Sequence, residues 1–176
     1  MNERARGKIR AKGETRVFPE EELGKILTRR KLTVAVAESC TGGLLSNRIT
    51  DVPGASSYFL GGIIAYRNDI KRQLLNVSGE LLDTYGAVSE ETARAMACGC
   101  RELFNSAIAI AVTGIAGPGG GTFDKPVGLV YVAVAFESGT TCERFQWSGD
   151  RIANKESTVS AALKSVILAL GRSDDS

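Results

Sequence analysis

The chain has 176 residues, of which 43% are hydrophobic and 24% are charged, and its net charge at pH 7 is +2. A chain of this length and composition is expected to form one globular domain that buries its own core without disulfides or metal ions. The near-neutral charge argues against nucleic acid or an anionic membrane surface as the main partner. No apolar run reaches the roughly 18 residues of a transmembrane helix.

The chain begins with a polar, basic segment. Because this segment has no sustained apolar face, residues 1–17 are predicted to form a mobile tail and residues 18–172 the folded domain. We expect the tail to be solvated, and contact with nucleic acid is the alternative. Its basic side chains are Arg4, Arg6, Lys8, Arg10, Lys12 and Arg16.

The first half of the domain alternates helices with strands. Pro19 and the glutamates after it open a helix that is expected to end near Arg30. Apolar spacing then predicts a buried strand, a helix, a second strand and a second helix. These elements span residues 32–37, 42–50, 58–66 and 68–75.

The second half opens with a helix and a buried strand. Ser89, followed by two glutamates, is typical of a helix N-cap, and the apolar period continues to Phe104. The continuous apolar run at residues 107–112 is typical of a strand covered on both faces. A glycine-rich loop, the two strands of a hairpin and a last helix are predicted over residues 114–121, 127–136, 140–147 and 150–170. The whole pattern predicts an α/β fold, a three-layer α/β/α domain with a mixed sheet.

The four cysteines have no spacing typical of a zinc site. Cys98 and Cys100 are two residues apart in a predicted helix, so they do not share a face. We therefore expect reduced thiols and no metal site in a cytoplasmic protein. The cysteines are Cys40, Cys98, Cys100 and Cys142.

The chain has no histidine, so a serine nucleophile needs another base. The segment Ala37-Glu38-Ser39-Cys40-Thr41-Gly42-Gly43 directly follows the first predicted strand. Ser39 therefore lies where α/β sheets bind ligands, and the glycines leave backbone N–H groups accessible. We interpret Ser39 as a reactive hydroxyl. The alternative is that Ser39 or Thr41 caps the next helix.

Two polar residues follow the second predicted strand. Tyr66 closes this strand and Lys71 lies one turn into the next helix, so both side chains can face the same edge of the sheet. A lysine can deprotonate a serine only if burial or a neighbouring cation lowers the lysine pKa. The alternative is that Lys71 is an ordinary surface residue.

A possible anion-binding loop follows the third strand. Thr113 and the glycine-rich loop from Gly114 to Gly121 offer a hydroxyl and bare amides, although they lack the Gly-Lys-Ser/Thr of a P-loop. Arg151 lies in the first turn of the last helix, where a cation is disfavoured unless it shares an anion with the helix amides. The alternatives are a flexible loop and a solvated arginine.

Several segments, taken in order, resemble those of one known family. They are Ala37-Glu38-Ser39-Cys40-Thr41-Gly42-Gly43, Tyr66-x-Asn68-x-x-Lys71, Gly86-Ala87-Val88-Ser89, Val112-Thr113-Gly114-Ile115-Ala116-Gly117-Pro118 and Lys125-Pro126-Val127-Gly128. Over about residues 20–170, the chain resembles the CinA C-terminal domain family, whose enzymatic members are nicotinamide-nucleotide amidohydrolases. The resemblance implies hydrolysis of nicotinamide mononucleotide to nicotinate mononucleotide and ammonia, without a metal or cofactor.

The resemblance also implies roles for individual residues. Ser39 would be the nucleophile, and Lys71, with Tyr66 relaying or orienting, would take its proton and return it to ammonia. Backbone N–H groups of the serine turn would hold the oxyanion, and the glycine-rich loop and the arginine would hold the phosphate or ribose. The implied oxyanion- and substrate-binding residues are Thr41, Gly42, Gly43, Asn68, Thr113, Gly114, Gly117 and Arg151.

The implied partner is a small pyridine nucleotide, and neither nucleic acid nor a membrane is required. The resemblance is also compatible with a homo-oligomer. Two other functions stay open. One is a non-catalytic nucleotide- or partner-binding module linked to competence or DNA damage, and the other uses Cys40 as the nucleophile without a histidine partner.

Overall fold

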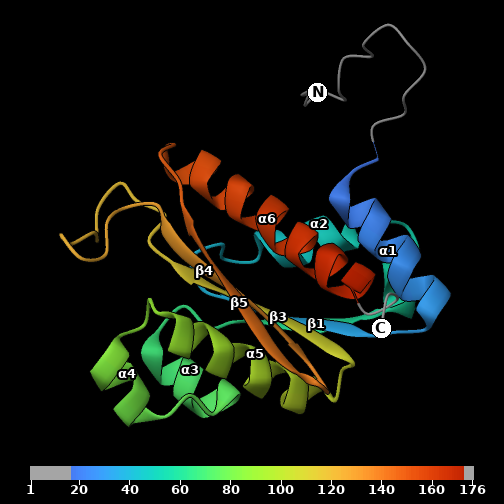
Figure 1. Ribbon diagram of the computed structural model, residues 1–176, viewed down its shortest axis with the longest axis horizontal. Helices are drawn as coiled ribbons and strands as arrows, with labels where there is room; N and C mark the ends of the chain where they lie inside the picture. The colour runs from blue at the N-terminus through green and yellow to red at the C-terminus, as the bar shows by residue number, and fades with distance from the viewer. Residues whose placement is uncertain (1–16, 173–176) are drawn as a thin grey trace, which may run out of the picture.

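A five-stranded mixed sheet forms the middle layer of the domain (Figure 1). The structure is a computed structural model that describes residues 17–172, so the predicted basic tail lies outside the described residues except for Val17. Three strands are parallel, and the last two form an antiparallel hairpin at one edge. In spatial order the strands are β2 (Phe59–Ile64), β1 (Val34–Glu38), β3 (Ile108–Gly114), β4 (Leu129–Phe136) and β5 (Gly139–Gln146).

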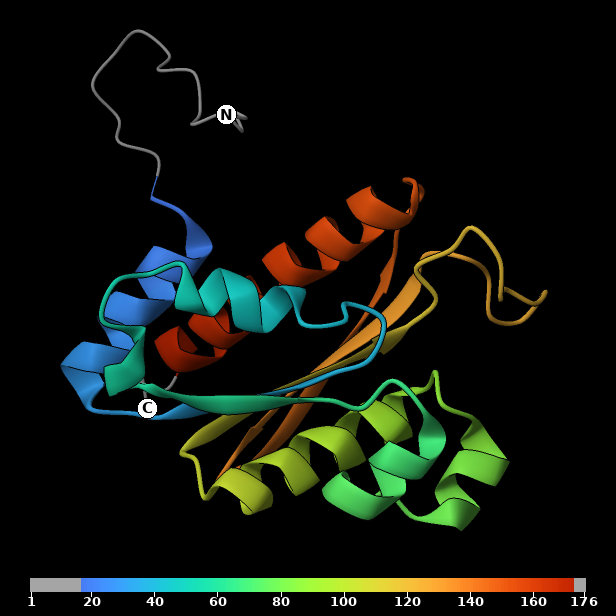
Figure 2. The same ribbon diagram turned by 180° about the vertical axis from the view of Figure 1, so that it is seen from behind.

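Helices cover both faces of the sheet, which confirms the predicted three-layer α/β/α fold (Figure 2). One face carries α1 (Pro19–Arg30), α2 (Leu44–Thr50) and α6 (Arg151–Arg172). The other face carries α3 (Asn68–Leu75), α4 (Gly79–Tyr85) and α5 (Glu90–Phe104). A single 3₁₀ turn, Ala55–Ser57, precedes β2. Within the described part of the chain, no helix has the length and apolarity to cross a bilayer.

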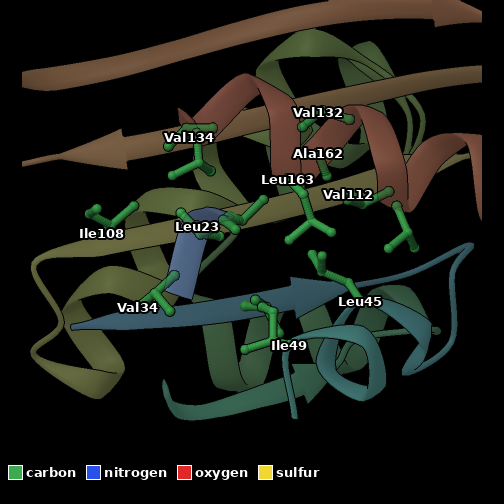
Figure 3. Packing of buried hydrophobic residues seen from close by; sticks show 14 of the residues in the cluster. Leu23, Val34, Leu45, Ile49, Ile108, Val112, Val132, Val134, Ala162 and Leu163 are labelled. Carbon is green, nitrogen blue, oxygen red and sulfur yellow. The ribbon is translucent and has the colours of Figure 1, made fainter. Parts of the chain in front are cut away.

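The two faces of the central strands differ in the size of their side chains. On the side of α1, α2 and α6, β-branched residues such as Val34, Ile108 and Val132 pack with Leu45 and Leu163 (Figure 3). The opposite face presents alanines, at Ala35, Ala37, Ala109, Ala111, Ala133 and Ala135. The small side chains let α5 lie close to the sheet. Because both faces are buried, β1 and β3 have the continuous apolar sequences expected of such strands.

Helix α3 rests directly on α5. A side chain at Gly99 of α5 would overlap the backbone of Leu75 at the end of α3, so a glycine is needed for this close approach. Since α3 also carries Lys71, the contact between the two helices helps to place that lysine relative to the sheet.

The predicted elements begin and end within two residues of the observed ones, and one observed helix has no predicted counterpart. The predicted helix at residues 42–50 begins at Leu44, because Gly42 and Gly43 have positive φ angles of 61° and 96°. Helix α4 was not predicted, since it is short and buries only Leu82 among its side chains. The predicted N-cap of α5 is confirmed: Ser89 Oγ accepts a hydrogen bond from the Thr92 N–H at 3.1 Å.

Candidate active site

The carboxyl ends of the three parallel strands meet at one cavity. The Ser39 turn follows β1, the Tyr66–Lys71 segment follows β2, and the glycine-rich loop follows β3. This is the position at which open α/β sheets bind ligands. The cavity has a volume of about 270 Å³ and is lined by Ser39, Cys40, Tyr66, Lys71, Ala87, Val88, Thr113, Gly114, Ile115, Ala116, Gly117, Gly119, Gly120 and Arg151.

Lys71 reaches from the first turn of α3 to the serine. Its Nζ lies 3.2 Å from Ser39 Oγ, 2.7 Å from the Ala65 carbonyl oxygen and 3.5 Å from the Tyr66 carbonyl oxygen. The Lys71 side chain is only 1% exposed, so the alternative of a surface lysine is wrong. The structure thus brings together two residues that are 32 positions apart in the sequence.

The surroundings of Lys71 favour its neutral form. Burial lowers the pKa of Lys71 from its ordinary value, and interaction with the Cys40 thiol partly opposes this shift. A neutral amine has two N–H donors and one lone pair. As an ammonium group, Lys71 Nζ donates to Ser39 Oγ and to both carbonyl oxygens. As a neutral amine, it can give its two N–H donors to the carbonyl groups of Ala65 and Tyr66, which leaves the lone pair for the hydroxyl of Ser39. The geometry therefore suits a general base.

Neither Ser39 nor Thr41 caps α2. The N-cap position belongs to Gly43, which has no side-chain cap. The carboxylate of Glu38 instead binds the start of the helix, accepting hydrogen bonds from Gly43, Leu45 and Ser46. Glu38 was not predicted as a functional residue. The available signal was an acidic residue just before a helix start that lacks a serine or threonine cap.

Part of the predicted oxyanion cradle is already engaged within the protein. The Gly42 N–H donates to the Ser39 carbonyl at 3.2 Å, and the Gly43 N–H donates to Glu38 Oε2 at 3.0 Å. The lining of the cavity does not include Thr41, Gly42, Gly43 or Asn68. The hydroxyl of Thr41 is buried and has no hydrogen-bond partner within residues 17–172. The roles of these four residues stay predictions.

Tyr66 and Arg151 meet at the mouth of the cavity. Arg151 donates from Nη2 to the Tyr66 hydroxyl at 3.1 Å and from Nη1 to the Gly117 carbonyl at 2.6 Å. The Tyr66 side chain is 58% exposed, and its hydroxyl faces Arg151, whereas only its backbone carbonyl contacts Lys71. The first turn of α6 is capped by Asp150, whose Oδ1 accepts from the Ala153 N–H at 2.8 Å. The arginine thus links Tyr66 to the glycine-rich loop at the mouth of the cavity.

The glycine-rich loop is held in place by contacts that link several elements. Thr113 Oγ1 donates to the Ala87 carbonyl at 2.6 Å, which ties the end of β3 to the Gly86–Ser89 segment. The buried amide of Asn154, on α6, donates to the Ala116 carbonyl at 3.1 Å. Asn154 was not predicted, since an asparagine within a helix has no distinctive local pattern. A side chain at Gly114 would come within 2.7 Å of the Leu129 carbonyl oxygen, so close packing requires this glycine.

Cys40 is poorly suited to act as the nucleophile. Burial raises the pKa of its thiol to about 12, so the thiol is protonated at neutral pH. Within residues 17–172, no three Cys, Asp or Glu side chains are grouped as metal ligands.

Comparison with known proteins shows which family this site belongs to. Residues 18–170 match the family model described as the CinA C-terminal domain. A relative from Desulforudis audaxviator, named as a competence-damage inducible protein, is 54% identical over 154 residues. The match covers 88% of this chain and 37% of that protein. The chain therefore spans about a third of the length of the curated relatives that it matches.

Solved structures show the same fold. The crystal structure of competence/damage inducible protein CihA from Agrobacterium tumefaciens is 40% identical with a TM-score of 0.81, covering 88% of this chain and 98% of that one. The competence damage-inducible protein A (ComA) from Klebsiella pneumoniae is 32% identical with a TM-score of 0.85, covering 87% and 95% of the two chains. Every residue of the cavity lies inside the range that matches the family model. The chain belongs to the CinA C-terminal domain family, which includes nicotinamide mononucleotide deamidases.

Proposed function

We propose that the protein hydrolyses the carboxamide of nicotinamide mononucleotide, giving nicotinate mononucleotide and ammonia. The observation that carries this proposal is the 3.2 Å contact between Lys71 Nζ and Ser39 Oγ in a cavity where the lysine is buried. A serine and a desolvated lysine form a nucleophile and base pair that needs no histidine.

The reaction would take two steps. In the first, Ser39 Oγ attacks the carboxamide carbon while its proton passes to Lys71, and the lysine returns the proton to the leaving nitrogen as ammonia departs. The product of this step is an ester between the nicotinoyl group and Ser39. In the second step a water molecule, deprotonated by Lys71, attacks the ester, and that proton passes to Ser39 as the acid product leaves. The new carboxyl group then ionises by releasing its own proton to solvent.

The turn after Ser39 still offers donors for the oxyanion. The backbone N–H of Cys40, a residue that lines the cavity, donates to no other residue within 17–172, in contrast to those of Gly42 and Gly43. Fixed N–H donors aimed at a developing negative charge are typical of amide hydrolysis. We assign the oxyanion contacts to this part of the turn.

The lining of the cavity suits an anionic mononucleotide. It contains the guanidinium of Arg151, the amine of Lys71 and no acidic side chain. Arg151 lies at the mouth, where a phosphate would remain partly hydrated, and Ala87, Val88 and Ile115 offer apolar contacts to a pyridine ring. Ligand pockets span about 300–1,000 Å³. The cavity, at about 270 Å³, lies close to the lower end of this range.

The test is ammonia release from nicotinamide mononucleotide by the purified protein and two variants. Ser39→Ala should lower kcat by at least about 1000-fold, because the nucleophile is removed. Ser57→Ala, which alters an exposed hydroxyl outside the cavity, is the matched control and should leave kcat unchanged. Equal ammonia release by the wild type and Ser39→Ala would contradict the proposal. Calorimetric binding of the nucleotide without any turnover would indicate a binding module instead.

A further inference from the structure

The carboxylate of Glu38 is the most highly coordinated buried side chain next to the nucleophile. Glu38 is 0% exposed and immediately precedes Ser39. Its Oε2 accepts from the N–H groups of Gly43 and Leu45, both at 3.0 Å. Its Oε1 accepts from the N–H and the Oγ of Ser46, at 2.8 and 2.7 Å. All four donors are neutral, and three of them belong to the backbone at the start of α2.

These bonds close the turn that carries the nucleophile. The turn from Ser39 to Gly43 leaves the end of β1 and enters α2, and the Glu38 carboxylate joins its two ends. A carboxylate in this place is also stabilised by the positive end of the helix dipole. Without this bridge, the two glycines with positive φ would leave the turn few contacts to hold its shape.

The backbone of Glu38 is linked to the base as well. Its carbonyl accepts from the Ala65 N–H at 2.8 Å, and the Ala65 carbonyl in turn accepts from Lys71 Nζ at 2.7 Å. The same short segment thus fixes the hydroxyl of Ser39 on one side and an acceptor of Lys71 on the other. The distance between the two reacting groups depends on the position of this segment.

We propose that Glu38 is a positioning residue for the Ser39–Lys71 pair, acting through the closed turn and not through contact with substrate. The role rests on the proposed function, because it concerns the geometry of that nucleophile and base. Its charge is needed because a carboxylate presents two acceptor oxygens to four donors. A glutamine at this position replaces one acceptor oxygen by an NH₂ group, so backbone N–H donors lose their acceptor in either amide orientation. Two are lost if the NH₂ group takes the place of Oε2, and the Ser46 N–H is lost if it takes the place of Oε1, where the Ser46 hydroxyl can turn to accept.

The experiment compares Glu38→Gln and Ser46→Ala with the wild type in the ammonia assay. Displacement of a reacting group by about 1 Å is worth about 100-fold in rate, so kcat should fall by about 100-fold in Glu38→Gln. KM should stay within about threefold, because the residues at the cavity mouth are untouched. Ser46→Ala removes one of the four bonds and should lower kcat by about 10-fold.

The matched control is Glu20→Gln. Glu20 also holds α2, through bonds of 2.9 and 2.5 Å to Arg48, but it does not contact the turn. Its loss should destabilise the domain while kcat stays within about twofold of the wild type. Circular dichroism and thermal unfolding confirm that each variant is folded before it is assayed. An unchanged kcat in a folded Glu38→Gln overturns the proposal. If Glu38→Gln does not fold, an unchanged kcat in Ser46→Ala overturns it.

A substrate-independent arm separates this proposal from the proposed function. A small fluorophosphonate reports on Ser39 directly: a bond forms between Ser39 Oγ and phosphorus, the P–F bond breaks, fluoride leaves, and the serine proton passes to Lys71. Mass spectrometry measures the labelled fraction over time. If the wild type is labelled and Glu38→Gln is labelled about 100-fold more slowly, the positioning role is supported even if the nucleotide is not hydrolysed. Equal labelling rates overturn the positioning role while ammonia release still stands, and a wild type that is neither labelled nor active overturns both proposals.

Discussion

Replacing Lys71 with methionine tests whether a buried amine is the base. Methionine keeps the length of the side chain but removes the amine, so kcat should fall by at least about 100-fold. The substitution also has a stability effect that depends on pH. The side chain is 1% exposed, and burial lowers the pKa of Lys71 in the folded protein below its value in the unfolded chain.

The sign of the pH effect follows from proton binding. Between the folded and unfolded pKa values, the unfolded chain holds a proton on Lys71 that the folded protein has released. The stability of the wild type therefore rises with pH in this window, by at most about 1.4 kcal/mol per pH unit. In Lys71→Met this contribution is absent, while all other titrating groups are shared. Wild-type stability should thus increase relative to the variant up to the unfolded lysine value of about 10.4, and the difference should level off above it.

The measurement is urea-induced unfolding of both proteins at several pH values from neutral to alkaline. Loss of the hydrogen bonds to Ala65 and Tyr66 changes the free energy of unfolding by the same amount at every pH. The test is therefore how the difference in this free energy between the two proteins changes with pH, and not its size at one pH. Lys164→Met, at an exposed position on α6, is the control for the loss of a lysine that is not buried. A difference between wild type and Lys71→Met that stays constant with pH would refute a depressed pKa at Lys71.

Three further substitutions probe the surroundings of the pair. Thr41→Val should leave the free energy of unfolding, measured in urea titrations, unchanged or raise it by about 1 kcal/mol, because the buried hydroxyl has no partner among residues 17–172. A lower free energy of unfolding would mean that the hydroxyl is bonded in solution. Arg151→Gln should raise KM for the mononucleotide by roughly 10- to 100-fold and change KM for the nucleoside little, and equal effects on both would argue against a phosphate contact. Cys40→Ala should keep kcat within about threefold in the ammonia assay, since its thiol has a pKa of about 12; abolished turnover would restore the cysteine as a candidate nucleophile.

Much of the fold could be predicted because local signals agree with the tertiary structure. The helix from Asn68 to Leu75 and the cap at Ser89 lie where the sequence indicates, since both are set by neighbouring residues. The buried strands could be recognised by their continuous apolar runs. Helix α4 could not be, because a seven-residue element with one buried side chain carries too little periodicity.

Some residues of the candidate cavity could be predicted from the sequence, but their contacts could not. Ser39 and Lys71 both follow parallel strands, so their approach could be expected from topology. The depth of Lys71 could not, because it depends on how α3 packs on α5, a contact between distant segments. Likewise, the hydroxyl of Tyr66 binds Arg151, 85 positions away, and no local pattern indicates this pairing.

The glycine at position 99 links a helix contact outside the cavity to the position of Lys71. This residue lies in the interior of α5 and does not line the cavity. A side chain there would overlap the backbone of Leu75, so α3 would have to move away from α5, and the amine of Lys71 would move with it. A change in turnover without a change in any group that meets the ligand is then the expected outcome of Gly99→Ala. Variation among natural chains at such helix crossings would adjust catalytic power while the residues around the reacting atoms stay the same.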